Sequence, residues 1–111
     1  MFEKDVKEIS LLLDFYGELL SERKQSVLAL YYNEDFSLAE IAEEIGISRQ
    51  GARELIKKAE EELHHLEEKL GLVSKFEQAR RHIADIRSLC KQASIPAALS
   101  SEIEALAKLF E

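Results

Sequence analysis

A group of polar and basic residues near the middle of the chain has side chains suited to contacting nucleic acid. Its members carry hydroxyl, amide or cationic groups, and they are Ser48, Arg49, Gln50, Arg53, Lys57 and Lys58. Arg and Gln form paired hydrogen bonds with the major-groove edges of guanine and adenine, so Arg49 and Gln50 are candidates for base contacts. Arg53 and Lys57 are candidates for contacts with bases or phosphates. Together these residues predict a DNA-binding surface.

Two features of the surrounding sequence weigh against DNA. The net charge is −7, whereas non-specific binding to DNA needs a positive field. Residues 60–68 carry five glutamates, which would repel phosphate and confine contact to residues 49–58, where the local charge is +3. The alternative interpretation is a solvated helix face held by i, i+4 pairs, such as Glu54 with Lys58. Gly51 is a poor helix former that either admits a close approach to DNA or only weakens the helix start.

Residues 38–57 have the spacing of a helix-turn-helix, the unit that can present its second helix to the major groove. Ala42 is small where the two helices must cross closely, and Gly46, four positions later, can adopt the positive φ of the turn. Apolar residues that would lock the helices together are Ile41, Ile45, Ile47, Ala52 and Leu55. Ser37 with Glu40 has the pattern of a capping box, and the serine after the turn is a second N-cap.

Apolar residues recur through the rest of the chain with the 3.6-residue period of amphipathic helices. The predicted helices cover residues 5–20, 22–33, 38–45, 49–70, 74–92 and a last segment from about Pro96 onward. The predicted fold class is therefore all-α, a helical bundle with a helix-turn-helix and additional C-terminal helices. We expect a helix-turn-helix domain with an N-terminal helix at residues 1–73. Residues 74–111 should form a helical hairpin that packs on the same domain or makes a dimer.

Two apolar surfaces favour a homodimer. The helix at 5–20 has an unusually broad apolar face, and the helix at 74–92 has a heptad-like seam of Phe76, Ala79, Ile83, Ile86, Cys90 and Ala93. A symmetric dimer would place two recognition helices on one duplex. The last helix is expected to bury Ile95, Leu99, Ile103, Leu106 and Phe110. In the helix at 22–33, Tyr31 continues the buried stripe, and Tyr32 is a candidate interface residue.

The sequence shows no pattern of an enzyme, a metal site or a cofactor site. Cys90 is the single cysteine, so it cannot form an intramolecular disulfide, and we expect it to be a small buried hydrophobe. His64 and His65 are adjacent, so they point in different directions, unlike metal ligands at i and i+4 of one helix. We expect a cytoplasmic protein without membrane insertion, because no apolar run or leader pattern is present. The basic residues of 74–93 are either a polar face opposite the seam or a second surface for RNA or DNA backbone.

The sequence also resembles a known family. The segment FSLAEIAEEIGISRQGARELIKKAEEEL is similar to region four of bacterial sigma factors. The pieces DFYGELL, LALYYNEDFSLAEIAEE and SRQ are closer still to the YlxM-like helix-turn-helix family, over most of residues 8–80. The resemblance implies an all-helical fold, DNA binding with transcription regulation, and an accessory role in the signal recognition particle pathway. A partner among RNA or protein components of that particle is the alternative. The family pattern has a bulkier apolar residue at Ala52, and the chain beyond Ala79 matches no known family pattern.

Overall fold

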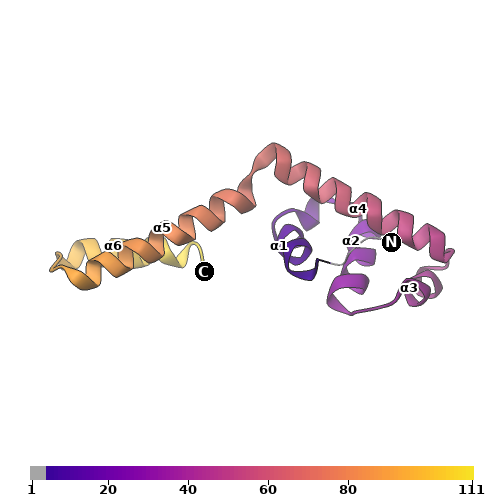
Figure 1. The fold of residues 1–111 in the computed structure, drawn as a ribbon, viewed down its shortest axis with the longest axis horizontal. Coiled ribbons are helices and arrows are strands. Elements are labelled where there is room, and N and C mark those ends of the chain that lie inside the picture. The colour runs from indigo at the N-terminus through magenta and orange to yellow at the C-terminus, as the bar shows by residue number, and fades with distance from the viewer. Residues whose placement is uncertain (1–4) are drawn as a thin grey trace. The chain divides into compact units, whose positions relative to one another are not determined.

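The computed structural model describes residues 5–111, and within that range it contains helices and no strand (Figure 1). The predicted all-α class is confirmed. The chain divides into two compact units, one ending at Gly71 and the other running from Leu72 to Glu111. Among the described residues, no helix is both long and apolar enough to span a membrane. Residues 1–4, on which the expectation about a leader depends, lie outside the described part of the chain.

The first unit is organised around one long helix. In chain order its elements are α1 (Val6–Tyr16), the 3-10 turn η1 (Gly17–Leu19), α2 (Glu22–Leu28), the π-turn η2 (Ala29–Asn33), α3 (Leu38–Ile45) and α4 (Arg49–Leu70). Helix α4 packs against α1, α2 and α3, as Figure 1 shows. The residues of α4 that face this core are Ala52, Ile56, Ala59 and Leu63, all fully buried. The apolar stripe expected from the helical period of residues 49–70 also includes Leu55 and Leu66, which are half-buried, and Leu70, which is exposed.

The N-terminal helix is shorter than predicted. At Tyr16 the backbone leaves regular helical values, with φ −119° and ψ −4°, and a 3-10 turn follows. The turn changes which side chains face the core, so Leu20 is buried while Leu19 is exposed. Val6, the first residue of the expected stripe, is exposed as well. The broad apolar face at 5–20 is therefore largely used inside the first unit, through Ile9, Leu12, Tyr16 and Leu20.

The prediction for the two adjacent tyrosines was wrong. Tyr32 is buried, whereas Tyr31 is only partly covered and stacks edge-on against it, with ring centroids 5.1 Å apart. The reason is the π-turn η2, in which the amide of Glu34 donates to the carbonyl of Ala29, five residues earlier. The wider turn inserts one residue relative to an α-helix and rotates the following side chains. A regular helical period places the wrong tyrosine in the core.

The second unit is a hairpin of α5 (Leu72–Gln92) and α6 (Ala97–Lys108). The two helices run antiparallel, since Phe76 near the start of α5 contacts Phe110 after the end of α6, with ring centroids 5.4 Å apart. Pro96 is the N-cap of α6 and not its first helical residue, one position from the expected start.

The predicted stripes of both hairpin helices need correction. Ile83 of the α5 seam is buried, but Ile86 is exposed and Cys90 is only half-buried. On α6 the buried residue is Ala107, while Leu99 and Leu106 of the predicted stripe are exposed. The small Ala107 faces α5, and the larger leucines lie beside the line of contact. Helix α6 of the same chain therefore covers the α5 seam only in part, at Ile83 and its half-buried neighbours.

Candidate nucleic-acid interface

The turn between α3 and α4 is built by local interactions that the sequence predicted. The amide of Ser37 donates to Oε1 of Glu40 at 2.9 Å, and the amide of Glu40 donates to Oγ of Ser37 at 3.1 Å, so the capping box is formed. Gly46 ends α3 in the left-handed conformation, with φ 82°, and its amide donates to the carbonyl of Ala42 at 2.9 Å. Ala42 and Ile41 are buried where α3 meets α4. The helix-turn-helix is thus formed as expected.

Ser48 and Gly51 act together at the start of α4. The amide of Gly51 donates to Oγ of Ser48 at 2.9 Å, which satisfies one of the free donors of the first turn. A Cβ at position 51 would lie 3.1 Å from that same oxygen, so the glycine leaves room for the cap. Gly51 therefore has a local structural role that neither of the two earlier interpretations included. The Ser48 hydroxyl is committed to this cap, although it can still donate its own proton.

Most of the predicted contact residues lie on the exposed side of α4. Arg49, Gln50, Lys57 and Lys58 are exposed, whereas Arg53 is half-buried. At about 100° of rotation per residue, side chains three or four positions apart share one side of a helix. Gln50, Arg53 and Lys57 follow at such steps and form one row. Lys58 lies farther around the helix, so the structure brings together only part of the predicted set.

Gln50 is already engaged by a neighbouring carboxylate. Its Nε2 donates to Oε1 of Glu54 at 2.9 Å. The predicted pair of Glu54 with Lys58 is not formed among residues 5–111, because Glu54 bonds to Gln50 instead. No ion-pair partner is present within the described residues for Arg49, Lys57 or Lys58. These three cations are available to a partner, while Gln50 must release Glu54 before it can contact a base.

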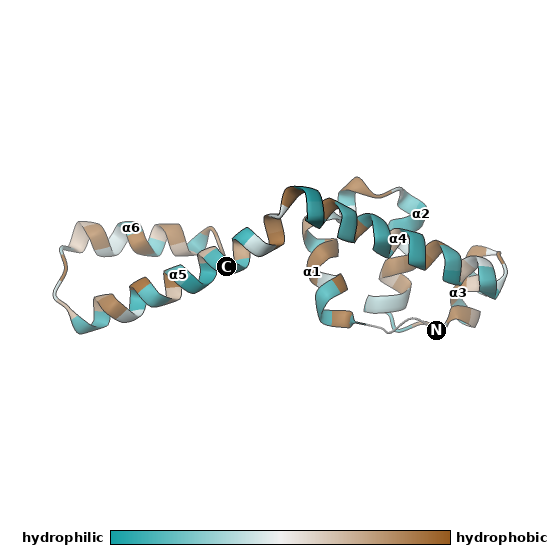
Figure 2. Cartoon of the chain, turned by 45° about the horizontal axis from the view of Figure 1, so that its top comes forward, coloured by the Kyte–Doolittle hydropathy of each residue, from teal (hydrophilic) through white to brown (hydrophobic). Residues whose placement is uncertain are grey.

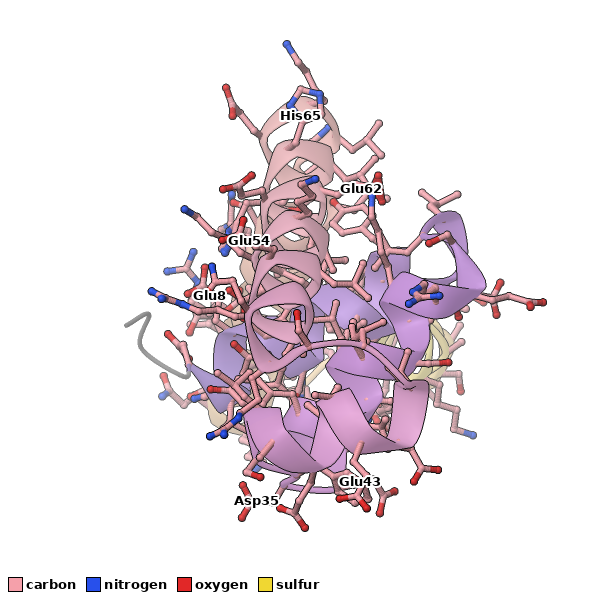
Figure 3. The ribbon with its side chains drawn as sticks, turned by 90° about the vertical axis from the view of Figure 1, so that its right-hand side faces the viewer. Glu8, Asp35, Glu43, Glu54, Glu62 and His65 are labelled. Atoms are coloured by element: carbon pink, nitrogen blue, oxygen red, sulfur yellow. The ribbon has the colours of Figure 1, made fainter. Side chains whose placement is uncertain are left out.

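Most of the glutamates at residues 60–68 of α4 contact other elements of the first unit. The Tyr16 hydroxyl donates to Oε1 of Glu67 at 2.5 Å, and the Tyr32 hydroxyl donates to Glu60. On another side of α4, Nζ of Lys24 lies 3.3 Å from Oε1 of Glu62. Three of the five glutamates therefore hold α4 to α1, α2 and η2. Figure 3 looks along α4 and shows that Glu62 and Glu54 project to different sides of the helix.

Burial makes the bond between Tyr32 and Glu60 a titrating contact. Burial raises the pKa of the Tyr32 phenol well above its usual range, and the Glu60 carboxylate raises it further. Burial also raises the pKa of Glu60, and the hydrogen bond from Tyr32 opposes that effect in part. The pair couples η2 to α4 across a sequence separation of 28 residues. A local reading of the sequence had no signal for it, because neither residue is unusual for its own helix.

The histidines and the cysteine do not assemble into a chemical site in the described part of the chain. Nδ1 of His64 lies 3.6 Å from Oε1 of Glu8, which links α4 to α1. Among residues 5–111, no three His, Cys, Asp or Glu side chains are arranged to hold a metal ion. The prediction of a buried Cys90 was only partly right, because its side chain is half-buried beside the hairpin contact.

Comparison with known proteins identifies the family. Residues 3–103 match the family described as "Putative helix-turn-helix protein, YlxM / p13 like", so the expectation that the chain beyond Ala79 matches no family was wrong. A UPF0122 protein of Desulforamulus reducens is 48% identical over 86 residues, covering 78% of this chain and 74% of that protein. A UPF0122 protein of Acetivibrio thermocellus is 43% identical over 106 residues, covering 96% of this chain and 91% of that protein. The chain therefore belongs to the UPF0122 family of helix-turn-helix proteins, the family that its resemblance to YlxM-like proteins predicted.

Proposed function

We propose that this protein is a cytoplasmic, non-enzymatic regulator that binds duplex DNA with the first half of α4 in the major groove. The observation that carries the proposal is the exposed row of Gln50 and Lys57, with Arg49 beside it, on the second helix of a well-formed helix-turn-helix. The segment 49–58 spans about 15 Å along the helix, which suits a major groove about 12 Å wide. Beyond it, exposed Glu61 and Glu68 would repel phosphate and limit the depth of contact.

The charge at the start of α4 supports this proposal. Helices α1, α2 and α3 each have a glutamate in the first turn, where a negative charge is favoured by the helix dipole. Helix α4 has no acidic residue there, as is also true of α5 and α6, but unlike those two it begins with a cation, Arg49, which costs roughly 0.3–1 kcal/mol. Sequences break such local rules most often at functional positions. The backbone amides of the first turn of α4 can bind a phosphate, and a phosphate bound there would interact favourably with the Arg49 side chain.

The test is the salt dependence of binding to duplex DNA. With three or four phosphate contacts per subunit, log affinity should fall with log salt concentration at a slope of about −3 to −4. Replacing Lys57 by Ala should make the slope shallower by about 1 for every DNA sequence. Lys69→Ala is the matched control, because Lys69 is an exposed lysine in the last turn of the same helix. Equal effects of the two substitutions, or no binding at low salt, would reject the proposal.

Sequence preference is tested separately. The double substitution Arg49→Ala with Gln50→Ala should remove preference among sequences in an unbiased selection of duplexes. The slope of log affinity against log salt concentration should become shallower only by the amount that a phosphate contact of Arg49 contributes. Unchanged sequence preference in this variant would place base recognition elsewhere.

A second candidate is an interaction protein of the targeting machinery, which contacts the signal recognition particle or a polymerase-like partner. The exposed carboxylates of Glu54 and Glu61 favour it, since both lie on the outer side of α4 and would oppose DNA. This protein should then bind purified RNA or protein of the particle and should not bind duplex DNA. Binding of the particle by the Arg49→Ala, Gln50→Ala variant, at wild-type affinity, would exclude the same helix face for that partner.

A further inference from the structure

The hairpin of α5 and α6 leaves a row of large apolar side chains uncovered. On α5, Ile86 is 36% exposed and Leu89 is 63% exposed, and on α6, Leu99 and Leu106 are 48% and 45% exposed. Apolar segments recur along both helices in Figure 2. In the whole hairpin, only Val73, Ile83 and Ala107 are buried apolar residues.

These four side chains lie on the same face of the hairpin. On α5 the line that faces α6 runs through Ile83, and at about 100° per residue both Ile86 and Leu89 lie to one side of it. On α6 the corresponding line runs through Ala107, and both leucines lie to one side of it by the same reasoning. Because the helices are antiparallel, the two sides coincide. We call Ile86, Leu89, Leu99 and Leu106 the apolar face.

The opposite face of the hairpin is polar and is closed by an ion pair. Nη2 of Arg87 lies 2.7 Å from Oε2 of Glu104, and Nε of the same arginine donates to Oε1 at 3.2 Å. Contact with Arg87 holds the pKa of Glu104 below its usual range. The hairpin is thus amphipathic as a whole. Its polar face forms an ion pair within the monomer, whereas the side chains of its apolar face remain exposed.

We infer that the apolar face binds the same face of a second copy of this chain, giving a symmetric four-helix interface. The inference does not depend on DNA binding. The broad face of the N-terminal helix is largely used within one chain, so the inferred interface is a different one. It combines Ile86, the exposed isoleucine of the α5 seam, with three leucines beside that seam.

Size is the first argument for this partner. Autonomous units of about 40 residues or fewer usually need disulfides, metals or oligomerisation, because they bury too little apolar surface. Residues 72–111 form such a unit, and with Cys90 as the single cysteine it has no internal disulfide. Pairing two hairpins would produce a four-helix bundle, in which each apolar face supplies half of a shared core.

Self-complementarity is the second argument, and it favours a copy of this chain over an unrelated protein. A two-fold axis parallel to the helices places α5 of each copy over α6 of the other. The exposed side chains of Ile86 and Leu89 of one copy then meet Leu99 and Leu106 of its partner. A two-fold interface requires this kind of self-complementary surface.

The experiment compares two glutamate substitutions on α6 of the full-length protein. Leu99→Glu puts a charge on the apolar face, and Ser101→Glu puts the same charge on the exposed polar side of the same helix. Leu99 lies in the first turn of α6, which has no acidic residue, so a glutamate there is favourable for the helix itself. Loss of helix formation is therefore not an expected cause of any change.

Molar mass by light scattering at tens of micromolar gives the readout. The wild-type protein and Ser101→Glu should be dimers, and Leu99→Glu should be a monomer with unchanged helical circular dichroism. Leu89→Glu on α5 should give the same monomer. A wild-type monomer at this concentration, or a dimer in which Leu99→Glu and Leu89→Glu have no effect, would overturn the inference.

Discussion

Tyr32→Phe tests whether the glutamates of α4 serve the fold. The substitution removes one hydroxyl and keeps the ring, which is 5% exposed and packed edge-on against Tyr31. The hydroxyl donates to the carboxylate of Glu60, and a hydrogen bond to a charged group contributes about 1.5–3 kcal/mol. Glu60 is half-buried, so water can replace part of the lost bond. We therefore expect a loss in the free energy of unfolding of about 1–2 kcal/mol.

The assay is a double-mutant cycle with Glu60→Gln, followed by urea unfolding at neutral pH. Substituting both partners should cost less than the sum of the single substitutions, with a coupling energy of about 1 kcal/mol or more. In a domain of this size, a loss of about 1 kcal/mol lowers the melting temperature by about 4–8 °C.

A second cycle on the same helix gives the control. Lys24 and Glu62 form an ion pair at 3.3 Å with both side chains partly exposed, and such pairs contribute only about 0.2–1 kcal/mol. The Tyr32 cycle should therefore show the larger coupling. Additive effects of Tyr32→Phe and Glu60→Gln, within about 0.5 kcal/mol, would refute the view that this glutamate holds α4 to η2.

Three further outcomes are expected. Gly46→Ala should lower the free energy of unfolding by about 1–2 kcal/mol, because an L side chain is strained at φ 82°. No neighbour lies within 4 Å of the added Cβ, so a steric clash does not contribute. An unchanged melting temperature would contradict this prediction. Glu54→Gln should strengthen DNA binding in the same salt titration, since it removes the one negative charge of residues 49–58 and keeps an acceptor for Gln50; weaker binding would count against the groove contact. The pKa of Glu60 is raised, so its contribution to the free energy of unfolding grows as the pH falls towards about 4, whereas the pKa of Glu104 is lowered, so its contribution is kept down to that pH and is lost as the pH falls below about 4. Glu60→Gln and Glu104→Gln should therefore change the pH dependence of stability in opposite directions.

The sequence predicted the helix-turn-helix closely because that unit is built from short-range interactions. The capping box joins residues three positions apart, as does the bond from Gly51 to Ser48, and the left-handed turn needs only Gly46. The bounds of α4 were also correct, with Ser48 before it and Gly71 after it. Each of these features can be read within one helical turn. The candidate contact residues followed from the same pattern, since residues opposite the apolar stripe must be exposed.

The tertiary structure alone decided how those residues are used. Tyr16 meets Glu67 across 51 positions, so glutamates that look like an acidic surface are partners of buried tyrosines. Because of the π-turn, Tyr32 is buried in the core in place of Tyr31. In the hairpin, Ala107 is buried in place of Leu106. The local period of apolar residues cannot predict these contacts, because it describes a regular helix and does not include the elements that pack against that helix. The core of a helix is chosen by the surface that packs on it, and that surface comes from distant parts of the chain.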